Sequence, residues 1–363
     1  MKTQRTFALG AMLARGALLA PGAMLAPGAL IALIAAAALA PTPLAAADTP
    51  PLALLVGNKD DSTLAIVDPA SGKIVGRVPT GQDPHEVAVS ADGRLAFVAN
   101  YGTGPNPGST VSVIDVVAQK EVRKVDVSPM RRPHGITVAG GKVYFTAEMN
   151  KLIARYDPAA NQIDWLMGTG QNTTHMVLVG KDLNRIFTAN IGSDSITALE
   201  RAGTSGNWNA TQIPVGKGPE AISFTPDESQ VWTAHSRDGG VSVIDAATKK
   251  VIDTLDVKTR RSNRLKFTPD GKRVLITDLE GGELVVLDVA SRQEVKRIKL
   301  GKTPEGILVA PDGARAYVAV AGDNRVAIVD LQTLEVTGHL ATGNGPDGMA
   351  WADRRADRGA DRR

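Results

Sequence analysis

Short runs of apolar residues recur along the chain at nearly constant spacing. One such run ends in an acidic residue, at 65–68, 112–115, 154–157, 197–200, 242–245, 286–288 and 327–330. Successive copies lie 47, 42, 43, 45, 43 and 42 residues apart. Seven copies at this period are typical of a fold with one four-stranded blade per repeat. The pattern therefore predicts an all-β chain that forms a single seven-bladed β-propeller.

Each repeat contains four β-like runs, which we expect to form one antiparallel blade. An inner strand such as 220–224 is followed by a turn such as Pro311-Asp312-Gly313, and a second strand such as 315–319 comes next. Asp-Gly favours a hairpin because Gly accepts the positive φ of the turn. The third strand ends at the repeated Asp, which we expect to bond the backbone amides of the following turn.

The two ends of the repeat region predict how the ring closes. Residues 54–58 have the second-strand pattern with no inner strand before them, and residues 346–351 have the inner-strand pattern at the other end. We expect the C-terminal strand to complete the N-terminal blade, which leaves no open sheet edge at the join. The propeller is thus assigned to residues 48–351.

The segments on either side differ in composition from the repeats. Residues 1–47 begin with Lys2 and Arg5, continue as an apolar stretch and end in Ala45-Ala46-Ala47. This order predicts a secretory signal peptide and a periplasmic or secreted protein. A membrane anchor is the alternative, but the run at 29–40 has 12 apolar residues, and a spanning helix needs roughly 20. Residues 352–363 carry five Arg and three Asp, which predicts a disordered charged tail.

Composition excludes several kinds of function. The chain has no cysteine, so it has no disulfide, thiolate zinc site, iron–sulfur cluster or attached c-type haem. Its net charge of +3 falls to 0 without the three cations of residues 1–47, and to about −2 without the tail. A repeat region that is not basic argues against nucleic acid as the partner, although DNA binding stays open.

At the second strands the chain resembles the YVTN-repeat propellers, a family named for a Tyr-Val-Thr-Asn strand. The matching strands have the sequences Phe-Val-Ala-Asn at 97–100, Phe-Thr-Ala-Asn at 187–190, Trp-Thr-Ala-His at 232–235 and Tyr-Val-Ala-Val at 317–320. The resemblance implies a seven-bladed propeller. Its members include exported proteins of unsettled role, surface-layer proteins and relatives of lactonases and quinoprotein dehydrogenase subunits. Four repeats depart from the Asn position, with Glu148, His235, Asp278 and Val320.

Alignment of the repeats places two sets of polar residues at one mouth of the central channel. The first ring, at the start of the inner strands, consists of His85, His134, His175, Glu220, Asn263, Glu305 and Asp347. The second ring, at the end of the second strands, consists of Asn58, Asn100, Glu148, Asn190, His235, Asp278 and Val320. Four of the five histidines of the chain fall in these rings, which makes this mouth the candidate site.

The histidines allow three interpretations. His85, His134 and His175 occupy equivalent positions on consecutive blades, so they are candidate ligands of one transition-metal ion, with Glu220 or His235 nearby as a base or a further ligand. The rings are alternatively a pocket for a polar organic ligand, or a channel lining that bonds only backbone and water. No metal-binding spacing along the sequence supports the ion independently.

Arginine in the connectors adds a cationic element to the same rim. Arg132 and Arg261 hold nearly equivalent places on separate blades, and Arg binds carboxylate or phosphate through paired hydrogen bonds. If a ligand binds here, we expect it to be anionic.

The leading functional hypothesis is an exported, monomeric and non-catalytic protein that binds a small anion, a metal ion or a protein partner. The first alternative is a metal-assisted hydrolase of the lactonase type, in which Glu220 or Glu305 transfers protons. The second alternative is a DNA-binding propeller.

Overall fold

The computed structural model describes residues 48–203 and 206–355. The interpreted signal peptide at 1–47 and most of the expected charged tail lie outside the described residues.

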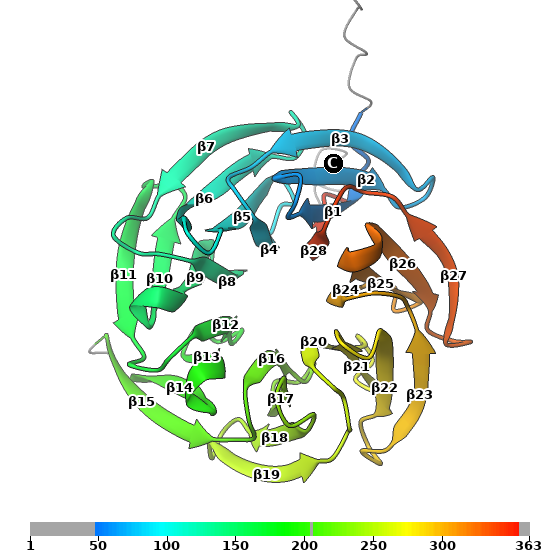
Figure 1. Ribbon diagram of the computed structural model, residues 1–363. Coiled ribbons are helices and arrows are strands. Elements are labelled where there is room, and N and C mark those ends of the chain that lie inside the picture. Colours follow the sequence, from blue (N-terminus) through cyan, green and yellow to red (C-terminus); the bar gives the residue numbers. More distant parts are fainter. Residues whose placement is uncertain (1–47, 204–205, 356–363) are drawn as a thin grey trace, which may run out of the picture. The chain divides into compact units, whose positions relative to one another are not determined.

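The described residues form seven four-stranded antiparallel sheets arranged as blades around a central channel (Figure 1). Blade 1 contains β28, β1, β2 and β3, and blades 2 to 7 contain β4–β7, β8–β11, β12–β15, β16–β19, β20–β23 and β24–β27. The prediction of a seven-bladed propeller with four antiparallel strands per blade is therefore confirmed.

The inner and second strands position the site. The inner strands are β28 (Pro346–Asp353), β4 (Pro84–Val89), β8 (Pro133–Ala139), β12 (Thr174–Val179), β16 (Pro219–Phe224), β20 (Ser262–Phe267) and β24 (Pro304–Val309). The second strands are β1 (Leu52–Asn58), β5 (Leu95–Gly102), β9 (Lys142–Ala147), β13 (Arg185–Asn190), β17 (Gln230–His235), β21 (Arg273–Asp278) and β25 (Arg315–Val320).

The third and fourth strands form the outside of the ring. The third strands are β2 (Thr63–Asp68), β6 (Pro107–Asp115), β10 (Leu152–Asp157), β14 (Ser195–Ala202), β18 (Val241–Asp245), β22 (Glu283–Asp288) and β26 (Arg325–Asp330). The fourth strands are β3 (Lys73–Pro79), β7 (Lys120–Asp126), β11 (Gln162–Gly168), β15 (Asn207–Pro214), β19 (Lys250–Leu255), β23 (Glu294–Lys299) and β27 (Glu335–Leu340).

Helix is confined, in the part of the chain that the structure describes, to three single turns after second strands. These are the 3₁₀ turns η1 (Glu148–Asn150), η2 (Ile191–Ser193) and η3 (Ala321–Asp323). None of these turns has the length or the apolar character that crossing a bilayer requires.

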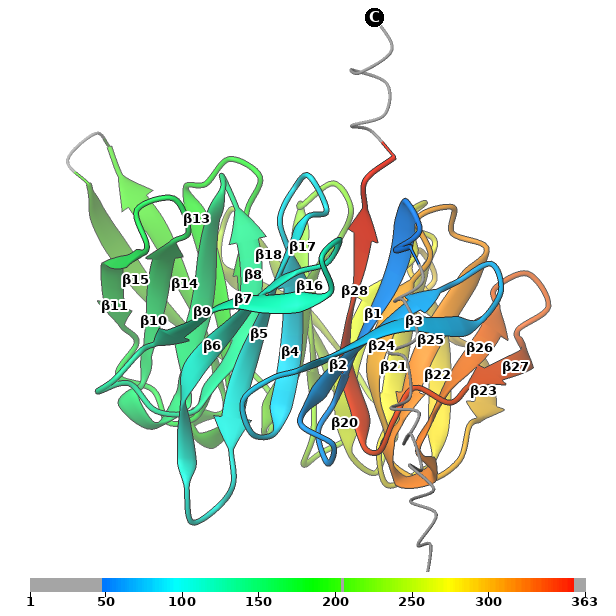
Figure 2. The ribbon, with the colours of Figure 1, turned by 90° about the horizontal axis from the view of Figure 1, so that it is seen from above.

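The ring closes as predicted, through the pairing of the last strand with the first. β28 lies antiparallel to β1, with Leu54 opposite Trp351 and Val56 opposite Met349 (Figure 2). The strand continues two residues beyond the expected end at Trp351, because Ala352 pairs with Ala53 and Asp353 with Leu52. Residues from the two ends of the repeat region therefore share one sheet.

The hydrophobic core lies between neighbouring blades. Among the described residues there are seven clusters of buried apolar side chains, and each joins two adjacent blades. One of them packs Leu54 and Val67 of blade 1 against Tyr317 and Val326 of blade 7. The clusters thus continue around the whole ring, including the join between its ends.

The aspartates at the ends of the third strands have the structural role predicted for them. Asp115 accepts hydrogen bonds from the backbone amides of Val117 and Ala118, at 2.9 and 2.8 Å. Asp330 accepts equivalent bonds from the amides of Gln332 and Thr333, both at 2.8 Å. These bonds satisfy turn amides that the sheet leaves unpaired.

Glycine at the start of some inner strands lets neighbouring blades approach closely. A Cβ atom on Gly348 would lie 2.0 Å from the carbonyl oxygen of His85, and a Cβ atom on Gly306 would lie 2.1 Å from that of Asp347. Both oxygens belong to backbone, so they cannot move aside as a flexible side chain would. The narrow channel mouth therefore requires glycine at these two positions.

We predict that Gly348→Ala destabilises the propeller. The added methyl group forces the inner strands of blades 1 and 2 apart, and overpacking of this kind typically costs about 1–3 kcal/mol. Urea unfolding monitored by Trp fluorescence measures the loss. Gly168→Ala is the matched control, because no atom lies within 4 Å of the position of its added Cβ. Equal stability of the two variants would contradict the close-packing argument.

Candidate functional site

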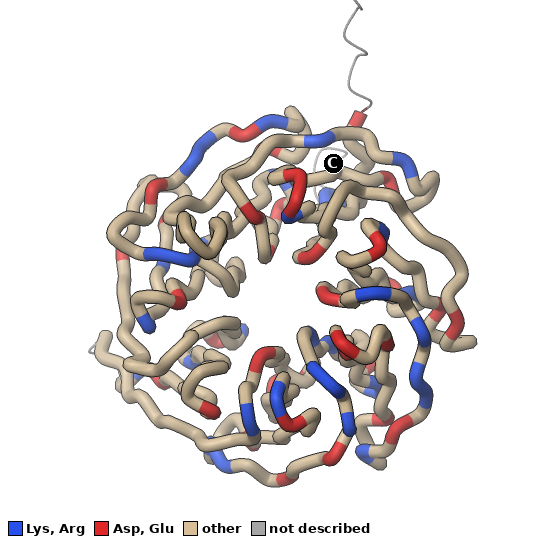
Figure 3. Tube along the Cα trace, in the orientation of Figure 1, with Lys and Arg blue, Asp and Glu red and all other residues tan. Residues whose placement is uncertain are grey.

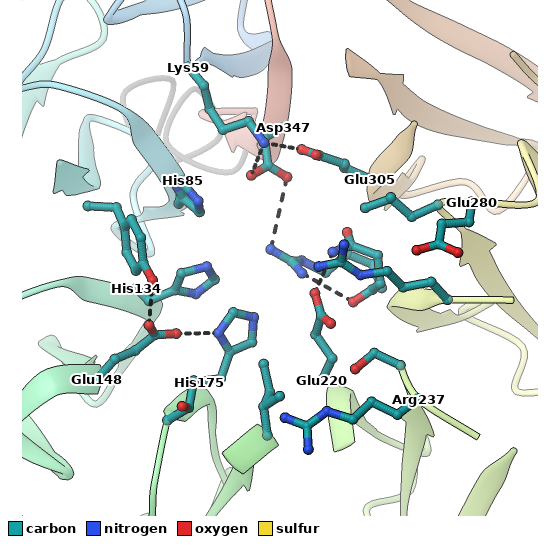
Figure 4. A pocket seen from close by; sticks show the side chains of 18 residues that line it. Lys59, His85, His134, Glu148, His175, Glu220, Arg237, Glu280, Glu305 and Asp347 are labelled. Atoms are coloured by element: carbon teal, nitrogen blue, oxygen red, sulfur yellow. Dashed lines mark hydrogen bonds and ion pairs between the residues drawn. The ribbon is translucent and has the colours of Figure 1, made fainter. Parts of the chain in front are cut away.

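The seven residues of the first ring all line one cavity at the channel mouth, which we call the mouth cavity. Its volume is about 600 Å3. The ring residues sit in inner strands of seven different blades, so the repeat brings them to one level: His85, His134, His175, Glu220, Asn263, Glu305 and Asp347. The close-up in Figure 4 shows the labelled members of this ring around the cavity.

The second ring contributes only Glu148 to the cavity lining. The other polar members turn toward the connectors that precede the inner strands. Asn100 accepts a hydrogen bond from the amide of Gly81 at 3.0 Å, and Asn190 accepts one from the hydroxyl of Thr174 at 3.1 Å. Asp278 accepts bonds from the amides of Arg260 and Arg261. These side chains fasten connectors to second strands, behind the cavity.

His235 lies with this fastening group and outside the cavity lining. Its Nδ1 contacts Asp238 at 2.9 Å, and its side chain is buried. Burial lowers its pKa below the ordinary value despite the opposing effect of Asp238, so the ring is neutral near pH 7. The structure thus places His235 away from the first-ring histidines.

Three stacked histidines and a tyrosine form one wall of the mouth cavity. The His85 ring stacks on Tyr101 at 4.4 Å between centroids and meets the His134 ring edge-on at 4.9 Å. The His134 and His175 rings lie 3.8 Å apart with a tilt of 32°. The approach of His85, His134 and His175 that the repeat alignment predicted is therefore seen in the structure, while the metal site predicted for them stays a prediction.

Glu148 holds this wall in place. One of its carboxylate oxygens contacts His175 Nδ1 at 2.5 Å, and the other accepts a hydrogen bond from the Tyr101 hydroxyl at 2.6 Å. Although burial opposes ionisation, the bonds from His175 and Tyr101 lower the pKa of Glu148 below its ordinary value. An ionised Glu148 fixes the proton of His175 on Nδ1, which leaves Nε2 unprotonated.

His134 is electrically neutral at physiological pH. Burial holds its pKa well below 6.5, and the neighbouring His175 and His85 lower it further. Burial also lowers the pKa of His85, although Asp347 and Asp83 oppose the effect. Neutral imidazoles are acceptors and potential metal ligands rather than cations.

Two carboxyl groups and a lysine form the opposite wall. Lys59 is hydrogen-bonded to Glu305 and lies 3.5 Å from Asp347. Burial, with the nearby Asp347 charge, raises the pKa of Glu305 to about 8. Burial would also raise the pKa of Asp347, but Lys59 and Arg264 outweigh it and lower that pKa. At neutral pH the negative charge therefore sits on Asp347, and Glu305 keeps its proton.

An ion pair crosses the channel beneath the cavity. Arg264 of blade 6 binds Glu86 of blade 2, with Nε donating to a carboxylate oxygen at 2.8 Å. Each residue follows a first-ring residue by one position, so the pair lies one step deeper along the inner strands. Arg264 also lies 3.9 Å from Asp347. The pair connects opposite sides of the ring and forms the floor of the mouth cavity.

The two connector arginines occupy different environments. Arg261 is exposed and lines the cavity. Arg132 is outside the lining: its guanidinium donates to the Tyr101 hydroxyl at 2.9 Å and lies 4.8 Å from the ring centroid. The exposed Arg237, which follows β17, lines the cavity beside Arg261. The arginines at the mouth are thus Arg237 and Arg261.

Charges of both signs are interspersed around the whole ring (Figure 3). The cavity itself is lined by Lys59, Arg237, Arg261 and Arg264 together with the acidic residues Glu148, Glu220, Glu280, Glu305 and Asp347. A continuous basic stripe, which would follow a nucleic-acid backbone, is absent from the described residues.

Sequence reasoning missed several lining residues. Lys59 and Glu280 follow second strands, next to positions that the repeat alignment identified. A signal was available for Lys59 because it adjoins the second-ring residue Asn58. The partnership of Arg264 with Glu86 joins residues 178 positions apart, and no repeat pattern relates them.

The closed ring of seven blades around a polar cavity defines the class of the protein as a seven-bladed β-propeller. Residues 136–315 match the family model of the YNCE-like β-propellers, so over this part the chain is similar to that family. No curated protein is significantly similar to the chain in sequence.

Solved structures with the same fold are distant in sequence. The periplasmic gluconolactonase of Pseudomonas aeruginosa is 17% identical with a TM-score of 0.68, covering 83% of this chain and 98% of that one. A putative 6-phosphogluconolactonase of Bacteroides fragilis is 15% identical with a TM-score of 0.69, covering 83% and 97%. Hydrazine synthase of Kuenenia stuttgartiensis is 18% identical with a TM-score of 0.67, covering 77% and 92%. At these identities the likeness shows the fold alone.

We predict that stability falls as pH rises from about 5 to about 9, because of Glu305. The folded chain holds the Glu305 proton up to a pKa of about 8, whereas the unfolded chain loses it near the ordinary value. The folded state therefore binds more protons within this window, and the free energy of unfolding decreases as pH rises through it. Urea unfolding at pH 6 and pH 9 measures the effect. Glu305→Gln should reduce the difference; an unchanged difference would refute the assignment.

We also predict that Arg264→Met destabilises the chain by about 3–5 kcal/mol, as removal of one member of a buried ion pair typically does. The loss arises because Glu86 and Asp347 keep their charges without this partner. Adding Glu86→Met should restore part of the stability, since an apolar pair no longer buries a lone charge. Denaturant unfolding of the single and double variants tests this expectation. A double variant less stable than Arg264→Met would contradict it.

Proposed function

We propose that the chain is an exported, non-catalytic binding protein that holds a small anionic molecule in the mouth cavity. The observation that carries the proposal is the cavity of about 600 Å3, with seven first-ring side chains and two exposed arginines in its lining. Its volume lies within the range typical of small-molecule sites, roughly 300–1,000 Å3. The Arg264–Glu86 floor gives this cavity a closed base on a rigid scaffold.

The charges of the cavity support an anionic group in one position. Lys59 and Arg264 are already paired with buried carboxylates. The free cationic capacity thus lies at Arg237 and Arg261, whose guanidinium groups suit carboxylate or phosphate. The neutral imidazoles across the cavity would contact polar groups at the other end of the molecule.

Export is part of the proposal and rests on the pattern of residues 1–47. One protein with the same fold, the gluconolactonase of Pseudomonas aeruginosa, is periplasmic, which is consistent with an exported propeller.

We predict that a panel of sugar phosphates, aldonates and dicarboxylates contains compounds that raise the melting temperature of the purified protein. Arg237→Ala combined with Arg261→Ala should weaken such a compound at least tenfold in isothermal titration calorimetry, because the charged hydrogen bonds are lost. Arg131→Ala is the control, since Arg131 lies outside the cavity lining. Equal weakening of a neutral analogue would remove the anionic specificity, and no binding by the panel would count against the proposal.

A lactonase-type hydrolase is the second candidate. The observation that favours it is the Glu148–His175 pair, in which a carboxylate orients an imidazole that can act as a general base. Of the solved structures with the same fold, one is a gluconolactonase and another a putative 6-phosphogluconolactonase. Turnover of gluconolactone that is lost in His175→Gln would establish this function in place of the non-catalytic one.

A further inference from the structure

Two histidines of the mouth cavity have buried ring nitrogens without partners. His134 is 2% exposed and His175 is 7% exposed. His134 Nδ1 and His175 Nε2 have no hydrogen-bond partner among the described residues. A buried polar atom without a partner is unfavourable, and in native proteins it commonly marks the place of a bound ion or molecule.

The surroundings of His175 match those of a metal ligand. Its Nδ1 is bonded to Glu148, so the unpartnered Nε2 carries the free lone pair. Metal-binding histidines usually donate their other ring nitrogen to a carboxylate in this way, which fixes the ring orientation. Tyr101 in turn holds Glu148 through the second carboxylate oxygen. The order of contacts therefore runs from Tyr101 through Glu148 to His175.

His134 lies where a second ligand would be needed. Its ring centroid is 3.8 Å from that of His175. Donor atoms of His134, Glu148 and His175 lie within 4.8 Å of one another. Nitrogens that share a tetrahedral zinc ion are roughly 3.4 Å apart, given Zn–N bonds of about 2.1 Å. Small side-chain rotations would bring the two imidazoles to that separation.

We propose that His134 and His175 bind one divalent transition-metal ion, with Glu148 as the residue that positions His175. Imidazole nitrogens select ions of the zinc, cobalt, nickel or copper type over magnesium and calcium. His85 is outside this set, because its Nδ1 faces the carbonyl oxygen of Asp83 at 3.1 Å. The remaining coordination positions of the ion face the mouth cavity.

The inference deepens the proposed function and rests on it in taking the mouth cavity as the binding site. An ion with open coordination positions would bind the anionic molecule directly. The ion and the pair Arg237–Arg261 would then contact different parts of that molecule.

Titration of the metal-free, untagged protein with Co2+ alone tests the site. We expect one equivalent to bind, with visible absorption from nitrogen ligands and with heat in isothermal titration calorimetry. His134→Ala and His175→Ala should each lower the affinity at least a hundredfold. Glu148→Gln should lower it about 10–100-fold, as loss of a supporting carboxylate typically does. His339→Ala is the control for surface binding, because His339 is exposed on β27.

The same titration can overturn the proposal. Absence of Co2+ binding, or binding that survives both histidine variants, would refute it. A hundredfold loss in His85→Asn would show that the ligand set is wrong. X-ray absorption of the wild-type zinc complex needs no variant to fold, and fewer than two imidazole ligands there would also refute the site. If Co2+ fails to bind while anions still bind through Arg237 and Arg261, the metal site falls and the proposed function stands.

Discussion

The ion pair between Arg264 and Glu86 is the interaction on which the rest of the site depends. It joins inner strands from opposite sides of the ring at a depth just below the first ring. Without a group at this place the first-ring side chains would border an open channel; with it, they line a cavity with a floor. Its burial makes the geometry strict, because a lone charge at this position would be strongly unfavourable.

The seven inner strands then supply one side chain each to a common level, and differences among the repeats divide the chemistry. Blades 2, 3 and 4 contribute imidazoles, and blades 1 and 7 contribute the carboxyl groups that share Lys59. One wall of the cavity is neutral and rich in lone pairs, while the other carries compensated charge. A symmetric backbone thus builds an asymmetric site, as functional sites on rigid scaffolds commonly are.

The fold followed from the sequence because its causes are local and repeated. The regular period predicted the blades, and the incomplete first and last repeats predicted the pairing of β28 with β1. The first ring followed from equivalent positions in the repeats. The role of Glu148 as partner of His175, and the pairing of Arg264 with Glu86, did not follow. Both depend on how far long side chains reach between blades, which a repeat alignment does not contain.

The central claim is that the mouth cavity, and specifically its histidine wall, is where this protein binds its ligand. A crystal structure of the protein isolated from its own cells, without chelator or affinity tag, tests this claim most directly. The account predicts density for a bound group between His134, His175 and Arg261, in contact with His175 Nε2. Ordered water alone in the mouth cavity, with a bound molecule at another surface of the ring, would contradict it.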